Sequence, residues 1–311
     1  MELLSPAGNP ELALAAFDGG ADAVYCGLGR FNARERAENF TPESLGRIIR
    51  FAHSREKRVY VTFNTLIFEH ELGEMFEHLC TLSRLQPDAL IVQDPGVAAT
   101  VRKYFPDMTL HASTQMGIHN SAGLQCAAQL GFKRVILERQ ITLDELQIMA
   151  QDSPVELEVF LHGSLCCSLS GRCLLSAELC GASGNRGQCR QLCRKSFTPA
   201  GEKSGFYLSP ADLAGGALIP HLKKCRITSL KIEGRLRTPD YVWKTARAYR
   251  LLLDNPGDET AAAEANSLLK SAVGRNPGPA FWFKNTRQTL IDPAQSGVFG
   301  EAAATVIRVR V

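Results

Sequence analysis

Short apolar runs alternate with amphipathic segments from the first residue of the chain onward. The runs are rich in Val, Ile, Leu and Phe, and they lack the strict alternation of apolar and polar positions that marks a half-exposed strand. This pattern is typical of parallel strands that are covered on both faces. It predicts eight strands: Glu2–Pro6, Ala23–Leu28, Val59–Asn64, Ala89–Asp94, Thr109–Ser113, Arg134–Glu138, Leu157–His162 and Ser229–Glu233.

Helix-start signals separate these runs. Five times a capping residue stands directly before a proline suited to the first helical position. The pairs are Asn9-Pro10, Thr41-Pro42, Asp94-Pro95, Ser209-Pro210 and Thr238-Pro239. The segment from Thr142 to Glu145 has the spacing of a capping box. Eight strand–helix units over residues 1–255 predict an α/β fold, a closed (βα)8 barrel of the TIM type. A doubly wound open sheet is the alternative.

The pattern changes after residue 255. A loop signal at 254–258 precedes an Ala-rich segment that predicts a helix to about Val273, and glycines at 274–278 interrupt the chain again. The last run, Val298–Val311, is strand-like and stops in the middle of an alternating pattern. We therefore expect 256–311 to hold a linker, a helix and the start of a β-rich C-terminal domain. An edge strand that ends the chain is the alternative.

Composition narrows the class of protein. The 311 residues are 45% hydrophobic and 22% charged, which excludes disordered and collagen-like proteins. The start of the chain has an acidic second residue and no apolar core of a secretory signal. No window approaches the roughly 20 apolar residues of a membrane span. We expect a cytoplasmic protein without a membrane partner, in which thiols stay reduced.

Cysteine is the unusual residue. Six of the ten cysteines lie between Cys166 and Cys193, within a Cys-rich insertion at 164–200 that follows the seventh predicted strand. Four of them have the spacing C-x6-C-x15-C-x3-C. Clustered thiolates bind zinc or an iron–sulfur cluster, and zinc sites favour closer pairs. The spacing therefore favours iron–sulfur, although it matches neither common ferredoxin pattern. Two disulfides or buried free thiols are the alternative.

The remaining cysteines divide into two groups. Cys167 and Cys180 lie inside the insertion as spare thiols. The other four lie in apolar surroundings and are expected to be small core residues: Cys26, Cys80, Cys126 and Cys225.

A longer motif surrounds the first two clustered cysteines. Residues 158–176 read E-x-F-x-x-G-S-L-C-x4-G-x-C-x-L-S, the chain opens with ELLSPAG, and GADAVYCG and SLKIEGR occupy 20–27 and 229–235. Together these segments resemble the collagenase-like peptidase family, family thirty-two of the peptidases of unknown type. The likeness runs over nearly the whole chain.

The resemblance implies chemistry other than proteolysis. The better understood members carry a 4Fe–4S cluster and hydroxylate without dioxygen. Their substrates are a cytidine of large-subunit ribosomal RNA, the wobble uridine of transfer RNA, and ubiquinone precursors. Prephenate is associated with the RNA-modifying members as the hydroxyl source. The run Gly184–Arg194 most resembles the ribosomal RNA branch, which the expected C-terminal extension also fits. By position the cluster ligands are Cys166, Cys173, Cys189 and Cys193, with Cys225 the alternative to Cys193.

Charge is distributed unevenly along the chain. Residues 172–250 hold 15 Lys plus Arg against 5 Asp plus Glu, whereas the rest of the chain holds 20 against 27. A basic sector around the cysteines suits an anionic partner, either RNA phosphates or a small dicarboxylate. A solvated helix face is the alternative for Lys244, Arg247 and Arg250. The chain shows no identifiable stacking platform for bases. The anion-binding candidates near the cysteines are Arg186, Arg190, Arg194, Lys195, Arg235 and Arg237.

Polar residues at strand ends complete the candidate site, because the C-terminal rim of a barrel houses its chemistry. The catalytic candidates are His162, Glu138, Glu233 and Arg235, and the substrate-binding candidates are Asn32, Arg34, Asn64, Gln115 and Arg139. Asn32 and Arg34 enter through the family resemblance. His162 is either an acid/base near the cluster or a core histidine.

We expect an oxygen-independent hydroxylase that forms 5-hydroxycytidine in ribosomal RNA. Within the family, a transfer RNA uridine hydroxylase and a ubiquinone-type hydroxylase are the alternatives. A peptidase would need a nucleophile and a base, for which Cys166 and His162 are the only pair that suggests itself. No G-x-S-x-G or H-E-x-x-H motif supports that reading. A metal-stabilised RNA-binding module without catalysis is the remaining alternative.

Overall fold

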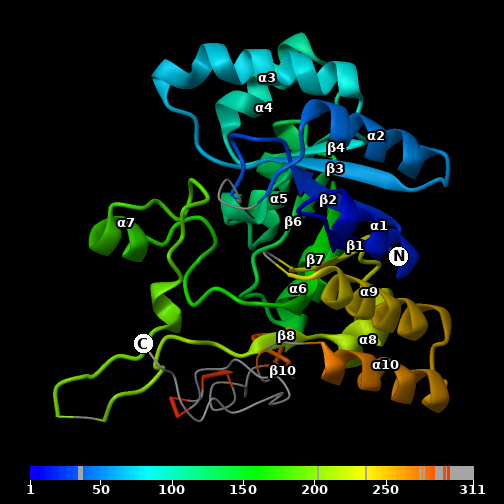
Figure 1. Ribbon diagram of the computed structural model, residues 1–311, viewed down its shortest axis with the longest axis vertical. Coiled ribbons are helices and arrows are strands. Elements are labelled where there is room, and N and C mark those ends of the chain that lie inside the picture. The colour runs from blue at the N-terminus through cyan, green and yellow to red at the C-terminus, as the bar shows by residue number, and fades with distance from the viewer. Residues whose placement is uncertain are drawn as a thin grey trace, which may run out of the picture.

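The predicted barrel is present in a computed structural model of the chain (Figure 1). The structure describes residues 1–33, 38–201, 203–234, 237–272, 275, 277–283, 290–291 and 293–294. Eight parallel strands form the wall, and their bounds lie within two residues of the prediction. They are β1 Glu2–Pro6, β2 Ala23–Gly27, β3 Arg58–Phe63, β4 Ala89–Val92, β5 Leu110–Ala112, β6 Arg134–Ile136, β7 Glu156–Gly163 and β9 Ser229–Ile232.

The sheet closes on itself. Parallel pairing runs in order from β1 to β7, then β7 pairs with β9, and β9 pairs with β1. At the closing seam Leu3 lies opposite Leu230, and Val159 lies opposite the same residue. An open doubly wound sheet would leave two edges unpaired, so closure excludes that alternative. The strands are buried on both faces, which is why they read as continuous apolar runs.

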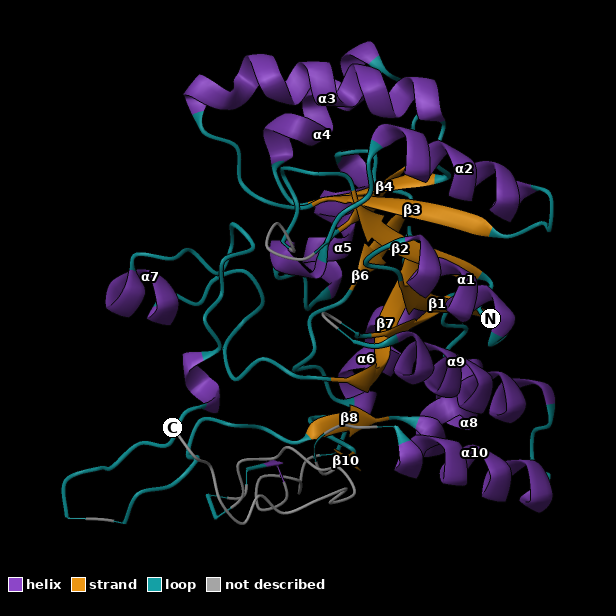
Figure 2. Cartoon of the chain, in the orientation of Figure 1, coloured by secondary structure: helices purple, strands orange, loops and turns teal. Residues whose placement is uncertain are grey.

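Helices surround the closed sheet (Figure 2). Their bounds are α1 Pro10–Asp18, α2 Pro42–His53, α3 Leu72–Leu85, α4 Pro95–Tyr104, α5 Ser121–Gln129, α6 Leu143–Gln151, α7 Leu175–Cys180, α8 Ile219–Lys224, α9 Pro239–Asp254 and α10 Glu259–Ser271. Four of the five capping-residue–proline pairs start helices, and the Thr142 capping box starts α6. Among the described residues, no helix is both long enough and apolar enough to cross a membrane.

The Ser209-Pro210 pair does not start a helix, so that prediction was wrong. The Ser209 hydroxyl accepts a hydrogen bond from Arg194 instead of capping a helix, and the chain continues into a short strand, β8 Asp212–Ala214. β8 pairs antiparallel with the end of β7 and parallel with β10 Pro277–Gly278. The segment between β7 and β8 contains the cysteines and α7, and it leaves the barrel on one side (Figure 1).

The C-terminal region is described only in part. The Ala-rich helix expected after residue 255 is α10, which packs against α9. Val298–Val311, for which the sequence predicts the start of another domain, lies outside the described residues. That expectation stays a prediction.

A buried charge network occupies the N-terminal end of the barrel. Arg134, 3% exposed, donates to Glu2 over 2.6 Å and to Glu158 over 3.3 Å, and pairs with Glu156 at 2.8 Å. Glu2 also accepts from the Tyr60 hydroxyl at 2.6 Å. We call these five residues the base network. Each group is satisfied by a partner on another strand, which is the condition for burying charge at tolerable cost.

Candidate active site

A cavity of about 130 Å3 lies at the C-terminal mouth of the barrel. Its floor and walls come from strands and strand ends, and its roof comes from the loop after β7. We call it the mouth cavity. Its lining residues are Tyr25, Ala33, Thr62, Asn64, Ile91, Ser113, Thr114, Gln115, Ile136, Arg139, Phe160, Cys166, Leu169, Ser170, Gly171, Cys173, Gly184, Cys189, Lys231 and Glu233. This is the face of a (βα)8 barrel on which chemistry is normally housed.

Three of the four proposed ligands, Cys166, Cys173 and Cys189, line the mouth cavity together. Among the described residues none of the three forms a disulfide, and soft sulfur donors on one loop suit an iron–sulfur cluster. Within the described part of the chain, no three His, Cys, Asp or Glu side chains are arranged to hold a metal ion. The chemistry of the three thiols fits a cluster, although they are not arranged as a metal site in this structure.

The fourth ligand position has two neighbouring thiols. A hydrogen bond between Cys167 and Cys193 lowers the pKa of Cys167 to about 7 and raises that of Cys193. The charges of Cys173 and Cys166 act in the opposite direction and raise the pKa of Cys167. Cys225 instead lines a separate cavity of about 420 Å3 with residues of α6 and α8. The structure therefore favours Cys193 or Cys167 over Cys225.

Glu138 and Arg139 at the end of β6 hold the cysteine loop from below. Glu138 accepts hydrogen bonds from the backbone N–H of Ser170 at 3.3 Å and from its hydroxyl at 3.0 Å. Arg139 donates to the same hydroxyl at 2.6 Å, pairs with Glu233 at 3.5 Å, and stacks 3.8 Å above the Phe160 ring. Glu138 is 4% exposed and does not line the mouth cavity, whereas Arg139 and Glu233 do.

Asn185 fastens the second half of the loop. Its side-chain amide donates to Gln93 at 2.8 Å and to Gln115 at 3.1 Å, and its oxygen accepts from the backbone N–H of Leu66. Gly171 approaches the same Gln115 so closely that an added Cβ would lie 2.8 Å from it, and its φ is +73°. The tight approach and the left-handed backbone together require glycine there.

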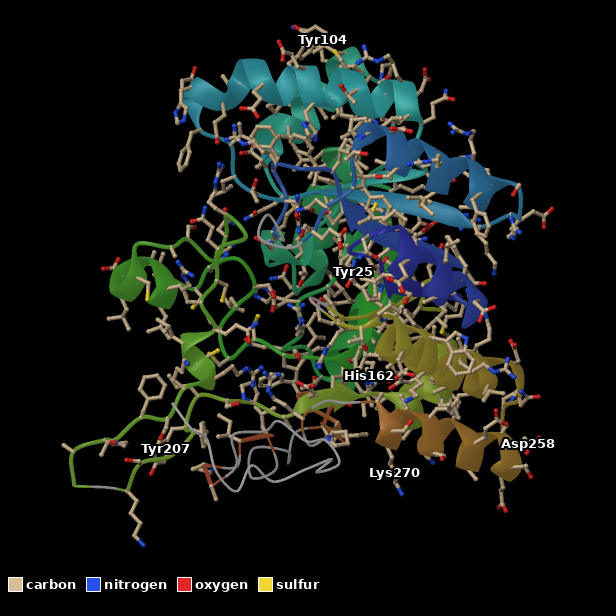
Figure 3. The ribbon with its side chains drawn as sticks, viewed as in Figure 1. Tyr25, Tyr104, His162, Tyr207, Asp258 and Lys270 are labelled. Atoms are coloured by element: carbon tan, nitrogen blue, oxygen red, sulfur yellow. The ribbon has the colours of Figure 1, made fainter. Side chains whose placement is uncertain are left out.

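His162 does not face the mouth cavity. Its Nδ1 lies 2.9 Å from the Tyr249 hydroxyl, and its ring packs against Tyr241 and Tyr249 of α9, where Figure 3 labels it. A register shift between Phe160 and His162 on β7 pairs His162 with Ile232, one position beyond the partner of Phe160. A bulge of this kind re-aims the following side chain. Burial lowers the pKa of His162 to about 4.

Three of the arginines expected to bind anions have structural partners. Arg186 pairs with Glu71 at 2.5 Å and lowers the pKa of that carboxyl through its hydrogen bonds. Arg194 donates to the carbonyl oxygens of Leu165 and Pro210. Arg237 pairs with Asp212 at 3.4 Å. Arg190 and Lys195 are exposed on the cysteine loop. None of the five lines the mouth cavity.

Of the two asparagine candidates, Asn64 lines the mouth cavity and Asn32 does not. Asn64 lines the mouth cavity, where it accepts from the backbone N–H of Ala33 and donates to the Ser113 hydroxyl at 3.4 Å. Asn32 is fully buried and donates to the carbonyl of Gly29 at 2.6 Å, which makes it a loop brace. Arg34 and Arg235 lie outside the described residues.

The sequence patterns did not identify two residues of the site, Asn185 and Lys231. Asn185 lies in the run that resembled the ribosomal RNA branch, and Lys231 lies in the SLKIEGR segment. A lysine inside an otherwise apolar strand is a signal that could have identified Lys231, because lysine is almost never fully buried without a partner. Its partner is Glu158, at 3.0 Å.

Comparisons with known proteins agree with the likeness seen in the sequence. The family model described as "Peptidase family U32" matches residues 8–292. The tRNA hydroxylation protein P of Helicobacter pylori strain J99 is 37% identical over 273 residues, covering 82% of this chain and 65% of its own. The 23S rRNA 5-hydroxycytidine synthase of Escherichia coli K12 is 33% identical over 296 residues, covering 93% and 44%.

Two further similarities concern proteins with peptidase names. A collagenase of Porphyromonas gingivalis is 32% identical over 305 residues, covering 90% of this chain and 72% of its own. The solved structure titled as the U32 peptidase Mk0906 superimposes with a TM-score of 0.51 at 10% identity, covering 75% of this chain and 93% of that one. That structural likeness supports the barrel fold. The chain spans less than two thirds of the length of the two hydroxylation relatives.

Proposed function

The chain belongs to peptidase family U32, and from that premise we propose that it is an iron–sulfur-dependent, oxygen-independent hydroxylase of an RNA base. One observation carries the proposal. Cys166, Cys173 and Cys189 line the same small cavity as the charged and amide side chains of the barrel mouth. A cluster held by these thiols would share one space with a reacting group.

The same cavity argues against a cysteine peptidase. The described lining contains no histidine, and the ring of His162 is hydrogen-bonded to Tyr249 beside α9. A thiol nucleophile needs an adjacent base to form its thiolate. Cys166 has no such histidine in the described part of the cavity, so proteolysis by this pair lacks its second member.

The residues of the mouth divide the work of the proposed reaction. Cys166, Cys173 and Cys189, with Cys193 or Cys167 as the fourth, would hold a 4Fe–4S cluster, which supplies a Lewis-acidic or redox-active iron when bound. Arg139 would bind a small anionic co-substrate, and Asn64 and Gln115 would orient the base by hydrogen bonds. Glu138 keeps the roof closed through Ser170, which excludes water from the reacting groups.

The reaction balances without dioxygen if the co-substrate is the hydroxyl donor. The base exchanges a C–H bond for a C–OH bond and loses two electrons, while the donor exchanges its C–OH bond for a C–H bond and gains them. Prephenate, which the family resemblance suggests, carries such a hydroxyl and two carboxylates. We propose cytidine of 23S ribosomal RNA as the acceptor, with the wobble uridine of transfer RNA as the second candidate.

Mass spectrometry of RNA from a deletion strain tests the proposal. We expect 5-hydroxycytidine to disappear from ribosomal RNA and to return with the wild-type chain but not with Cys166→Ala. Cys126→Ala is the matched control. The sequence pattern predicted a core position for Cys126, which was wrong: Cys126 is exposed on α5, so this variant should complement fully. Loss of hydroxyuridine from transfer RNA instead would move the assignment to the second candidate. Unchanged hydroxylation of both RNAs in the deletion strain would refute the proposal that the protein is an RNA hydroxylase.

Anaerobic reconstitution tests the cluster separately. We expect iron, sulfide and the broad visible absorbance of an iron–sulfur cluster, all lost in Cys166→Ala and Cys189→Ala. Cys193→Ala, Cys167→Ala and Cys225→Ala then identify the fourth ligand, and Cys225→Ala should retain the cluster. A protein that takes up one zinc and no iron or sulfide would contradict the cofactor assignment.

A further inference from the structure

Lys231 is a buried cation that reaches the mouth cavity from inside the barrel. It lies on β9 with 5% of its surface exposed and belongs to the cavity lining. Its Nζ lies 3.0 Å from Oε1 of Glu158 and 4.0 Å from the centre of the Tyr25 ring, which Figure 3 labels at the middle of the barrel. Both contacts hold the ammonium at the floor of the cavity.

Glu158 is itself held by the base network. It is fully buried, and its other oxygen lies 3.3 Å from Arg134. One carboxylate thus serves two cations, one below it in the base network and one above it at the cavity. Lys231 lines the cavity and Glu158 does not, so the positive end of this ion pair faces the cavity.

Arg139 supplies a second cation to the same lining. Its side chain is 9% exposed, and its Nε is buried with no hydrogen-bond partner among the described residues. A buried guanidinium donor without an acceptor costs free energy unless a ligand satisfies it. Glu233 is the acidic residue of the lining and pairs with Arg139 at 3.5 Å. Lys231 and Arg139 each have a carboxylate partner, Glu158 and Glu233, but of these two carboxylates the described lining contains Glu233 and not Glu158.

We propose that Lys231 and Arg139 together bind a carboxylate of a small co-substrate at the floor of the mouth cavity, and that Glu158 positions Lys231 for this. The inference rests on the proposed function and deepens it by naming a binding residue and the residue that orients it. A carboxylate accepts from an ammonium and a guanidinium at once, which gives charge-assisted hydrogen bonds from two directions. Lys231 and Arg139 both line this cavity of about 130 Å3, so one carboxylate group could contact both cations.

Competitive alkylation of the thiols tests this without any catalytic turnover. The same thiolate displaces iodide from iodoacetate and from neutral iodoacetamide. The ratio of the two rates therefore cancels the reactivity of the thiol and reports the local attraction for a carboxylate. In the metal-free full chain, we expect a higher ratio at Cys166, Cys173 and Cys189 than at exposed Cys126. Mass spectrometry of peptides gives the rate at each cysteine.

Substitutions at Lys231 and Glu158 then distinguish an effect of charge on the alkylation ratio from an effect of altered folding. We expect Lys231→Gln to lower the ratio at the cavity thiols about three- to fivefold, Lys231→Arg to restore it, and Glu158→Gln to change it less than Lys231→Gln. The double variant Lys231→Met/Glu158→Gln removes both charges and keeps the barrel free of an unpaired one. Lys133→Gln, an exposed lysine beside β6, is the matched control and should leave the ratio unchanged.

The outcomes for Lys231 and for the proposed function are distinguishable. An unchanged ratio in folded Lys231→Gln, or a ratio at the cavity thiols no higher than at Cys126, overturns the role of Lys231 even if RNA hydroxylation depends on the chain. A lowered ratio with RNA hydroxylation unaffected by deletion supports the carboxylate site and removes the RNA assignment. If the carboxylate site and the RNA hydroxylase function are both supported, Lys231→Gln should raise the KM for the hydroxyl donor more than it lowers kcat.

Discussion

The base and the mouth of the barrel both contain buried charge, but they satisfy it differently. At the base, Arg134, Glu2, Glu158 and Glu156 come from strands, and the one arginine pairs with all three carboxylates within the closed sheet. At the mouth, Arg139 and Glu233 follow strand ends, face a cavity, and leave a buried Nε without a described partner. Strands fix partners rigidly, whereas loops leave space for a ligand. Lys231 lines the mouth cavity and is linked to the base network by its ion pair with Glu158.

The largest effect is expected at the base. Arg134→Met leaves Glu2 and Glu158 buried without their shared cation, which should lower the free energy of unfolding by about 3–5 kcal/mol. Arg58→Met is the control, because Arg58 is 58% exposed in its pair with Glu2 and should cost less than about 1 kcal/mol. Urea denaturation measures both. Equal stabilities would mean that the base network does not hold the barrel.

His162 lies near the end of β7, where its ring packs against α9. His162 stays neutral when folded because burial lowers its pKa from the usual 6.5 to about 4. Its contribution to stability is therefore complete above pH 6.5 and is lost as the pH falls toward 4, by about 3 kcal/mol. His162→Gln should remove this part of the pH dependence, because glutamine does not titrate.

Comparing the free energy of unfolding of both proteins at pH 7 and pH 4.5 isolates this residue, since His78 and His111 titrate in both. His162→Gln should also retain RNA hydroxylation at pH 7, because the ring lies outside the mouth cavity. Complete loss of hydroxylation in a stably folded variant would restore His162 as a catalytic candidate.

The smallest effect on stability is expected at the mouth, together with a selective loss of activity. Gly171→Ala forces a left-handed backbone on alanine and brings its Cβ to 2.8 Å from Gln115, at a cost of about 1–3 kcal/mol. Gly181→Ala is matched, since Gly181 has φ +60° and nothing within 4 Å of an added Cβ. Only Gly171→Ala should abolish RNA hydroxylation in complementation. Equal activities would show that the loop does not need to seat on Gln115.

Much of the fold was predictable from local pattern. Buried parallel strands read as apolar runs, so all eight were located within two residues, and four capping-residue–proline pairs marked true helix starts. Ser209-Pro210 failed because the same residue types also suit the entry to a strand, and a long-range hydrogen bond from Arg194 decided between them. A pattern of neighbours along the chain does not contain that partner.

The chemistry was predictable in kind but not in arrangement. The sequence alone determined the eight strands, the loop that carries the thiols and the positive sector around it, because these depend on residue type and local spacing. Only the tertiary structure decided which side chains face the cavity. The register shift in β7 accompanies a His162 ring that packs toward α9. Arg186 pairs with Glu71, and Arg237 pairs with Asp212. Asn185 donates to Gln93, which lies 92 residues away in sequence. Such contacts depend on how distant segments dock, and closure of the barrel brought Lys231 of β9 beside Glu158 of β7.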